Sequence, residues 1–234
     1  MSELHYVGSE LELFAGVKNW KYYWSSLIRP FLKGDVLEVG AGIGANTELL
    51  HPGTAGRWVC IEPDPDLYKQ LVEKLKSANP PLGCEPACGI LDSMAGQQFD
   101  TILYIDVLEH IEQDREELKR AATYLRKGGN LIVLSPAHQY LYSPFDAGIG
   151  HFRRYSRDML REISPPNMRI EQMRYADCAG LILSAANKLM LRQSLPTKAQ
   201  LQVWDRYVIP VSRVLDGVFG YSLGKTVIGV WTKT

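Results

Sequence analysis

The strongest constraint on the fold is a glycine-rich stretch near residue 40. It reads Val36-Leu-Glu-Val-Gly-Ala-Gly-Ile-Gly-Ala-Asn46, an apolar run with one acid, then three glycines at alternate positions, then a helical pattern. We interpret it as a strand, a tight turn and a helix start, an arrangement that presents backbone N–H groups to a ligand at a sheet edge. Glycines also tolerate positive φ and leave no side chain between backbone and ligand. The stretch therefore predicts a nucleotide-type pocket.

Two cofactor classes fit this turn. The spacing of Gly40, Gly42 and Ala45 satisfies the dinucleotide fingerprint, and Glu62, twenty residues after Gly42, stands where an acid that binds ribose is expected for either class. Glu38, two residues before the first glycine, favours S-adenosylmethionine over NAD. We expect its carboxylate to face the cationic aminoacyl and sulfonium groups, whereas it would repel a pyrophosphate.

Three further stretches follow the glycine turn in order. They are Ile61-Glu-Pro-Asp64, Phe99-Asp-Thr-Ile-Leu-Tyr-Ile-Asp-Val-Leu-Glu-His110 and Leu125-Arg-Lys-Gly-Gly-Asn-Leu-Ile-Val133. With Leu37-Glu-Val-Gly-Ala-Gly-Ile-Gly44 they cover about residues 35 to 135, and the combination resembles class I S-adenosylmethionine-dependent methyltransferases. The resemblance implies a Rossmann-like α/β fold, with a seven-stranded, mostly parallel sheet, helices on both faces and an antiparallel last strand. It also implies S-adenosylmethionine as cofactor and S-adenosylhomocysteine as product.

The resemblance assigns roles around the cofactor. Glu62 ends the second strand, where its carboxylate can accept hydrogen bonds from the ribose hydroxyls. Asp92 stands where this class usually holds the adenine amino group, with N-capping as the alternative. Asp106 ends the fourth strand and should border cofactor and substrate. The expected cofactor contacts are Glu38, Gly40, Ala41, Gly42, Gly44, Glu62, Pro63, Asp92, Ser93, Asp106, Val107, His110, Trp20 and Tyr23.

We expect a single domain with three parts. Residues 1–33 form an N-terminal helical lid, 34–135 the cofactor-binding core, and 136–234 the substrate loop, a helical insertion over about 176–218 and the last strands. The lid carries a helical pattern over 9–32 and the aromatic cluster Trp20-Lys-Tyr-Tyr-Trp24. Plain packing against the sheet would explain this cluster. Because methyltransferases of this class often close the site with N-terminal helices, Asn19, Trp20 and Tyr23 are also candidates to cover the cofactor.

The stretch after the fifth strand should choose the substrate. Residues 135–156 are unusually polar and aromatic, and long loops at strand ends are commonly functional. The pattern His…Asp…Gly-His-x-Arg-Arg-Tyr resembles a large subgroup of class I methyltransferases, many of them linked to polysaccharide or other secondary biosynthesis. A hydroxyl acceptor must lose a proton, and a histidine is the usual agent. We expect His151 as that base and His138 as the second choice.

The arginines of this loop have two possible uses. Arg153 and Arg154 could grip a carboxylate or phosphate of the substrate, or one of them could pair with Asp146 to hold the loop. A mainly structural cluster is the alternative, since Ser156 can N-cap a following helix. The candidate catalytic residues are His151, His138, Arg153, Arg154, Tyr155 and Asp146.

Composition narrows the partners. The chain has 26 Lys plus Arg and 26 Asp plus Glu, so it has no net positive charge that would attract nucleic acid. The four cysteines form no Cys-x-x-Cys pair, and we expect no metal site. A secretion signal is lacking, and the apolar run from Cys178 to Leu191 is too short to span a bilayer. We expect a cytoplasmic enzyme, monomeric or homodimeric, without stable membrane insertion.

These observations predict methyl transfer to a small molecule, glycan- or lipid-linked molecules included, in a biosynthetic pathway. Oxygen is the expected acceptor atom, as a hydroxyl or as a carboxylate that needs no base, and carbon or nitrogen is the runner-up. Two other classes remain open: a NAD-dependent reductase and a non-catalytic module that binds S-adenosylmethionine.

Overall fold

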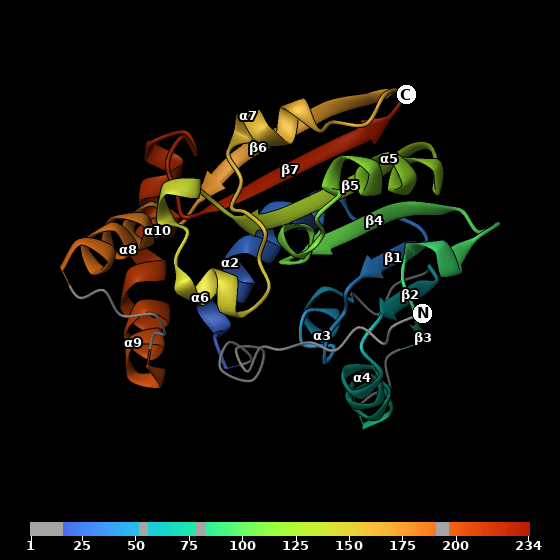
Figure 1. The fold of residues 1–234 in the computed structure, drawn as a ribbon, viewed down its shortest axis with the longest axis horizontal. Coiled ribbons are helices and arrows are strands. Elements are labelled where there is room, and N and C mark those ends of the chain that lie inside the picture. The colour runs from blue at the N-terminus through green and yellow to red at the C-terminus, as the bar shows by residue number, and fades with distance from the viewer. Residues whose placement is uncertain (1–15, 52–55, 78–82, 191–196) are drawn as a thin grey trace.

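A seven-stranded sheet of order β3-β2-β1-β4-β5-β7-β6 forms the centre of the protein (Figure 1). The computed structural model describes residues 16–51, 56–77, 83–190 and 197–234. β7 pairs antiparallel with β5 and β6, while β1 to β5 pair in parallel. The predicted fold and the antiparallel last strand are thus confirmed. The strands are β1 (Val36–Val39), β2 (Trp58–Glu62), β3 (Cys84–Cys88), β4 (Phe99–Ile105), β5 (Leu125–Pro136), β6 (Met168–Ala176) and β7 (Thr226–Lys233).

The fifth strand is longer than its apolar core predicts. The continuous apolar run covers residues 131–134, but the strand begins at Leu125, where it pairs with Phe99 across a register shift. Gly128 and Gly129 lie inside the strand, and Gly128 takes a φ of +77°. A positive φ at glycine is a common way to make such an irregularity in a strand.

Helices cover both faces of the sheet (Figure 1). One apolar layer lies between the sheet and α2, η5 and α10, and the other lies under α5 and α7. The predicted helical insertion before the last strand is present as α8, α9, η5 and α10. The helices are α2 (Lys18–Ile28), α3 (Thr47–Leu50), α4 (Pro65–Ser77), α5 (Asp114–Thr123), α6 (Pro144–Gly148), α7 (Arg157–Glu162), α8 (Cys178–Met190), α9 (Lys198–Val203), the π-helix η5 (Trp204–Val208) and α10 (Ile209–Val218).

The N-terminal helix α2 is fastened to the C-terminal insertion. The Trp20 ring lies 5.8 Å from the Trp204 ring, and the Tyr23 hydroxyl donates a 2.6 Å hydrogen bond to Asp216. Trp20 and Tyr23 are both buried. The two side chains therefore pack in the core, and their expected role in covering the cofactor stays a prediction. Residues 1–15 of the predicted lid lie outside the described residues.

Replacing Asp205 with alanine should lower the free energy of unfolding by about 1–2 kcal/mol, because its carboxylate caps the first turn of α2. The carboxylate accepts hydrogen bonds from the backbone N–H groups of Lys18, Asn19 and Trp20 at 3.1, 3.2 and 2.8 Å. Urea unfolding measures the loss. Asp158→Ala, which removes an exposed acid from the first turn of α7, is the control and should cost at most about 0.5 kcal/mol. Equal losses would contradict the cap.

Apolar side chains remain on the outer faces of the insertion. Ile182 on α8 and Val214 and Val218 on α10 are exposed by 70%, 66% and 73%. Among the described residues, no helix combines the length and the apolar character needed to cross a membrane.

Candidate functional site

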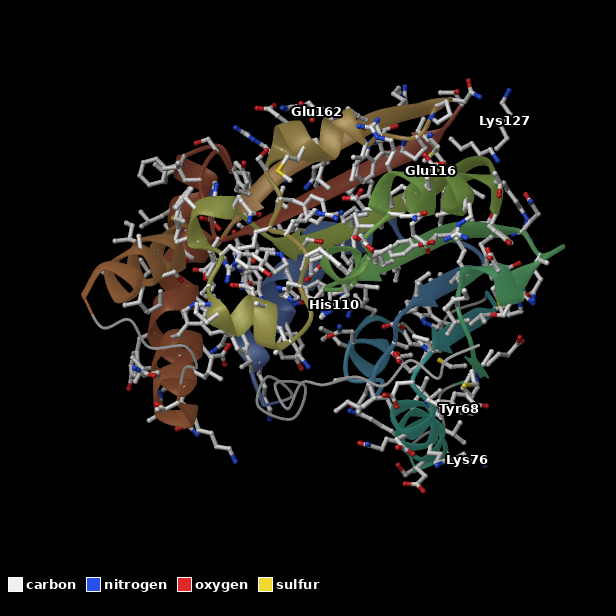
Figure 2. All side chains as sticks on the ribbon, in the orientation of Figure 1. Tyr68, Lys76, His110, Glu116, Lys127 and Glu162 are labelled. Atoms are coloured by element: carbon white, nitrogen blue, oxygen red, sulfur yellow. The ribbon has the colours of Figure 1, made fainter. Side chains whose placement is uncertain are left out.

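The predicted functional residues gather where the parallel strands end. The glycine turn follows β1, Glu62 ends β2, Asp106 follows β4, and Ser135 lies near the end of β5. Since the carboxyl ends of neighbouring parallel strands share one edge, these segments border a common region. Figure 2 places His110 near the middle of the molecule, whereas Lys76 and Lys127 project at its rim.

The glycine turn has the backbone that its sequence predicts. Gly40, Gly42 and Gly44 take φ values of +65°, +55° and +75°. A Cβ at Gly40 would lie 2.7 Å from Cγ2 of Val107, so this position has no room for a side chain. Val107, expected near the cofactor, thus packs directly on the turn. Ala41 ties the turn to β2, because its N–H donates to the Ile61 carbonyl at 3.0 Å.

Glu62 holds the glycine turn from the end of β2. One carboxylate oxygen accepts from the Gly42 N–H at 2.8 Å and the other from the Asp64 N–H at 3.0 Å. Burial raises the pKa of Glu62 above its ordinary value, and the two N–H groups act against that rise. The acid thus stands beside the turn, as the ribose role requires. Pro63 sits between it and Asp64, whose carboxylate caps α4.

Glu38 does not face a ligand, contrary to expectation. It is 2% exposed, and its carboxylate accepts hydrogen bonds from Thr47 Oγ1 at 2.8 Å and Trp58 Nε1 at 3.1 Å. Side chains alternate along a strand, and Glu38 shares its face with Val36 and Cys60, under α2 and α3. Burial raises its pKa to about 7. The carboxyl is therefore an interior group rather than an exposed anion at the sheet edge.

Glu38→Gln should flatten the pH dependence of stability. Folding raises the pKa of Glu38 from 4.5 to about 7. Its contribution to the free energy of unfolding is therefore complete below pH 4.5 and is lost as the pH rises through 7. Between pH 5 and pH 8 the free energy of unfolding of wild type should fall by about 2 kcal/mol more than that of the variant. Urea unfolding at both pH values measures this. Glu116→Gln, at an exposed position on α5, should keep the wild-type slope. A variant with an unchanged slope would refute this role of Glu38.

Asp92 and Ser93 have local partners. The Asp92 carboxylate lies 3.3 Å from a guanidinium nitrogen of Arg120 on α5 and is exposed. Ser93 Oγ donates to the Ile90 carbonyl at 2.6 Å. Asp92 lies inside the 3-10 helix η2 (Leu91–Met94), whose N-cap residue is Ile90. Its role at adenine stays a prediction.

Asp106 is exposed after the end of β4, and charged groups from distant parts of the chain act on its carboxyl. It takes a positive φ of 55° at the end of β4. Desolvation by the surrounding protein raises its pKa to about 6, while the charges of His151, Lys21 and Lys225 act in the opposite direction. Lys21 belongs to α2 and Lys225 immediately precedes β7, and neither stands in a recognisable motif. Sequence reasoning therefore missed both.

The substrate loop is organised around the buried side chain of Asp146. Its carboxylate lies 3.0 Å from Nδ1 of His151 and accepts two hydrogen bonds from Arg154, at 2.8 and 3.0 Å. It also closes a capping box with Ser143 at the start of α6. Burial would raise its pKa, but these hydrogen bonds hold the pKa of Asp146 well below its usual range. The predicted pairing of one arginine with Asp146 is confirmed, and Arg154 is that arginine.

Three of the candidate catalytic residues make polar contacts within the fold. The Arg153 guanidinium lies 2.5 Å from Asp114, and the buried Tyr155 hydroxyl donates to the same carboxylate at 2.8 Å. His138 Nε2 is 2.9 Å from the Gly224 carbonyl, and its ring packs on those of Tyr140 and Tyr175. Their expected chemical roles stay predictions, although hydrogen bonds within the fold engage the Arg153 guanidinium, the Tyr155 hydroxyl and Nε2 of His138.

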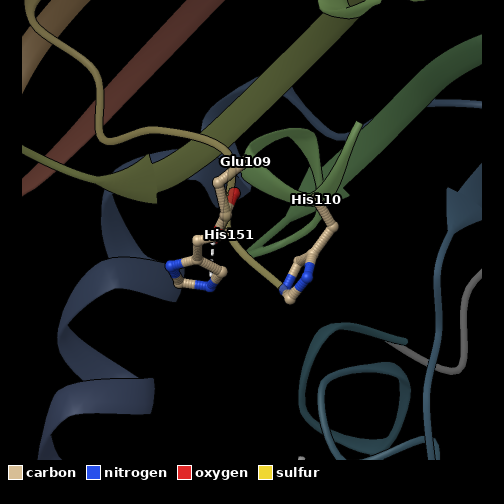
Figure 3. A group of neighbouring side chains, drawn as sticks. All are labelled: Glu109, His110 and His151. Carbon is tan, nitrogen blue, oxygen red and sulfur yellow. Dashed lines mark ion pairs between the residues drawn. The ribbon is translucent and has the colours of Figure 1, made fainter. Parts of the chain in front are cut away.

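Glu109, His110 and His151 meet at the strand ends (Figure 3). Glu109 is fully buried, with one carboxyl oxygen accepting from Ser135 Oγ at 2.9 Å. The other oxygen, Oε1, has no hydrogen-bond partner among the described residues and lies 3.9 Å from Nε2 of His151. The two imidazole rings are 4.5 Å apart, edge to face. Burial raises the pKa of Glu109 well above its ordinary value and lowers that of His110 to about 4.

No metal site was expected from the sequence, yet these three side chains form a group that could hold a metal ion. One possible ligand atom from each lies within 4.8 Å of the others. The adjacent Glu109 and His110 were visible after the fourth strand. Their meeting with His151 depends on how the loop folds back, which no local pattern reveals.

Comparison with known proteins agrees with the motifs. Residues 37–131 match the family model described as a methyltransferase domain. A ubiquinone biosynthesis O-methyltransferase of Parvibaculum lavamentivorans is 26% identical over 149 residues, which are 60% of this chain and 57% of the relative. A tRNA U34 carboxymethyltransferase of a Shewanella species is 31% identical over 121 residues, 49% of this chain and 36% of the relative. The chain thus spans about a third to just over half the length of these relatives.

Solved structures share the fold over almost the whole chain. A geranyl diphosphate methyltransferase in complex with GPP and sinefungin superposes with a TM-score of 0.65 at 12% identity, covering 99% of this chain and 89% of that protein. The resemblance stated from the motifs is confirmed by the matched family and by this fold. The chain therefore carries a methyltransferase domain, built on the fold of the class I S-adenosylmethionine-dependent methyltransferases.

Proposed function

We propose that the chain transfers a methyl group from S-adenosylmethionine to an oxygen atom of a small-molecule acceptor. The observation that carries the proposal is the placement of two groups at one edge of the sheet. The glycine turn with Glu62 stands at the ends of β1 and β2, and His151 with Glu109 stands at the ends of β4 and β5. In such sheets, ligands bind outside the carboxyl ends of the strands.

The first group fits the nucleoside part of the cofactor. Gly40 leaves no room for a side chain, and the turn exposes backbone rather than side chains to whatever lies against it. Glu62 stands beside Gly42 and offers two carboxylate oxygens, the acceptor pair that ribose hydroxyls require. We assign the ribose to Glu62 and the backbone contacts to Gly40, Ala41 and Gly42.

The second group fits the acceptor. S-adenosylmethionine supplies a sulfonium-bound methyl group: a C–O bond to the acceptor forms as the S–CH₃ bond breaks, S-adenosylhomocysteine leaves, and the hydroxyl proton goes to a nearby group or to solvent. His151 offers a lone pair at Nε2, because its Nδ1–H is directed to Asp146. Most of the acceleration of such a displacement comes from alignment. The His151 loop is the part of the chain we assign to aligning the acceptor.

A small acceptor is favoured over a nucleic acid, although one relative acts on tRNA. The formal net charge is zero, with 26 basic and 26 acidic residues. Arg153 and Arg154, the adjacent cations of the loop, are engaged by Asp114 and Asp146. A surface that binds nucleic acid needs several cations free to contact phosphates.

Calorimetric titration with S-adenosylhomocysteine and with NADH tests the cofactor class. We expect heat with the first and none with the second. Incubation with S-adenosylmethionine and a panel of hydroxylated and carboxylated small molecules then tests turnover, read as S-adenosylhomocysteine released. Binding of NADH alone would make the chain a reductase. Binding of S-adenosylhomocysteine without turnover on any panel member would favour a non-catalytic module and count against the proposal.

A further inference from the structure

We propose that Glu109, His110 and His151 bind a divalent transition-metal ion of the Zn²⁺ type, which holds and activates the acceptor oxygen. This inference rests on the proposed function and gives the same site a metal ion. Two imidazoles and one carboxylate are a ligand set that suits such ions and leaves coordination positions open for a substrate. Figure 3 shows the three side chains directed into one region at the strand ends.

The two oxygens of the Glu109 carboxyl have different surroundings. Oε1 is buried without a hydrogen bond from any described residue, while Oε2 is fixed by Ser135. Leaving a buried polar atom without a partner costs about 1–3 kcal/mol. The atom lies 3.9 Å from Nε2 of His151, and it has no hydrogen-bond partner among the described residues. A cation between them would satisfy both.

Hydrogen bonds also orient the two histidine rings. Histidines that bind metals usually donate the other ring N–H to a carboxylate or a backbone carbonyl. His151 is directed in this way to Asp146, which Arg154 and Ser143 hold in turn. His110 hydrogen-bonds the backbone of Gly150. Both rings thus have contacts of the kind that support metal-binding histidines.

The distances require little movement. Ligand atoms about 2.1 Å from a tetrahedral ion lie about 3.4 Å from one another. The Glu109 and His151 atoms are 3.9 Å apart, and all three candidate atoms fall within 4.8 Å. Rotation of His110 and a small closure of the loop would complete the site. A cation there lowers the pKa of a bound hydroxyl, so that the proton passes to solvent water and the oxygen remains as the nucleophile. His151 then acts as a ligand rather than as a free base.

Titration of the chelator-treated full chain with Co²⁺ tests this proposal. We expect one equivalent to bind, with visible d–d absorption of a low-coordinate site. Glu109→Gln and His151→Gln should each weaken binding at least 100-fold, and Asp146→Asn about 10- to 100-fold. His138→Gln, which changes a histidine outside the cluster, should bind as wild type does. Circular dichroism and S-adenosylhomocysteine affinity check that each variant is folded.

The outcomes separate the two proposals. Co²⁺ binding that persists in Glu109→Gln and His151→Gln would place the ion elsewhere and overturn the metal site. So would the absence of stoichiometric binding to wild type, and in either case S-adenosylhomocysteine binding would leave the proposed function standing. Co²⁺ bound at these residues by a protein that binds no S-adenosylhomocysteine would instead overturn the proposed function and keep the metal site.

Discussion

Asp146→Asn is expected to lower kcat about 100-fold while S-adenosylhomocysteine affinity stays within about threefold. The carboxylate fixes the tautomer of His151 by accepting from Nδ1, and it receives two hydrogen bonds from Arg154. An asparagine amide can serve only one of these partners with its oxygen and would present N–H groups to the other. The imidazole would then turn, or place its proton on Nε2, and the lone pair at the site would be lost.

Asp114→Asn is the matched control for this experiment. Asp114 also joins an arginine of the loop to a neighbour, because it pairs with Arg153 and accepts from the Tyr155 hydroxyl. It does not contact His151. Both variants should lower the free energy of unfolding, but Asp114→Asn should keep kcat within about threefold of wild type. Equal losses of kcat would mean that Asp146 acts only by holding the loop together.

The parts of this protein that local sequence determines were predictable. The glycine turn, the alternation of strands and helices, and Glu62 at the end of β2 all lie within short stretches whose residue types restrict the backbone. Glu38 shows where such reasoning ends. Its strand is apolar on both faces, so the pattern marks a buried strand without telling which face meets a ligand. The Glu38 carboxyl lies on the face that is packed into the interior.

Contacts between distant residues account for the remaining differences. Tyr23 meets Asp216 across 193 residues of chain, and nothing in the aromatic cluster of α2 distinguishes packing on the insertion from covering a cofactor. Glu109 meets His151 only because α6 and its capping box return the loop to the end of β4. Periodicity describes one element at a time, so it cannot give such tertiary pairs. The candidate site could be located from sequence, but the partners of its side chains could not.

Gly40→Ala is expected to raise the Kd for S-adenosylhomocysteine about 100-fold, which corresponds to about 2.7 kcal/mol. The residue has a φ of +65°, and its Cβ would lie 2.7 and 3.0 Å from the two methyl carbons of Val107. Valine is stiff at χ1, so the side chain has little freedom to turn away. The turn would have to move off the end of β4, and its N–H groups would leave the positions set by Ala41 and Glu62.

Gly96→Ala separates this effect from backbone strain. Gly96 has a similar φ of +80°, but a Cβ there meets no heavy atom within 4 Å. Backbone strain should therefore lower the free energy of unfolding of each variant by about 1–2 kcal/mol, measured by urea unfolding. Only the change at Gly40 should weaken the binding of S-adenosylhomocysteine, measured by calorimetry on folded protein. If Gly40→Ala binds S-adenosylhomocysteine as Gly96→Ala does, the turn does not form the cofactor pocket, because a displaced backbone could not keep the same contacts.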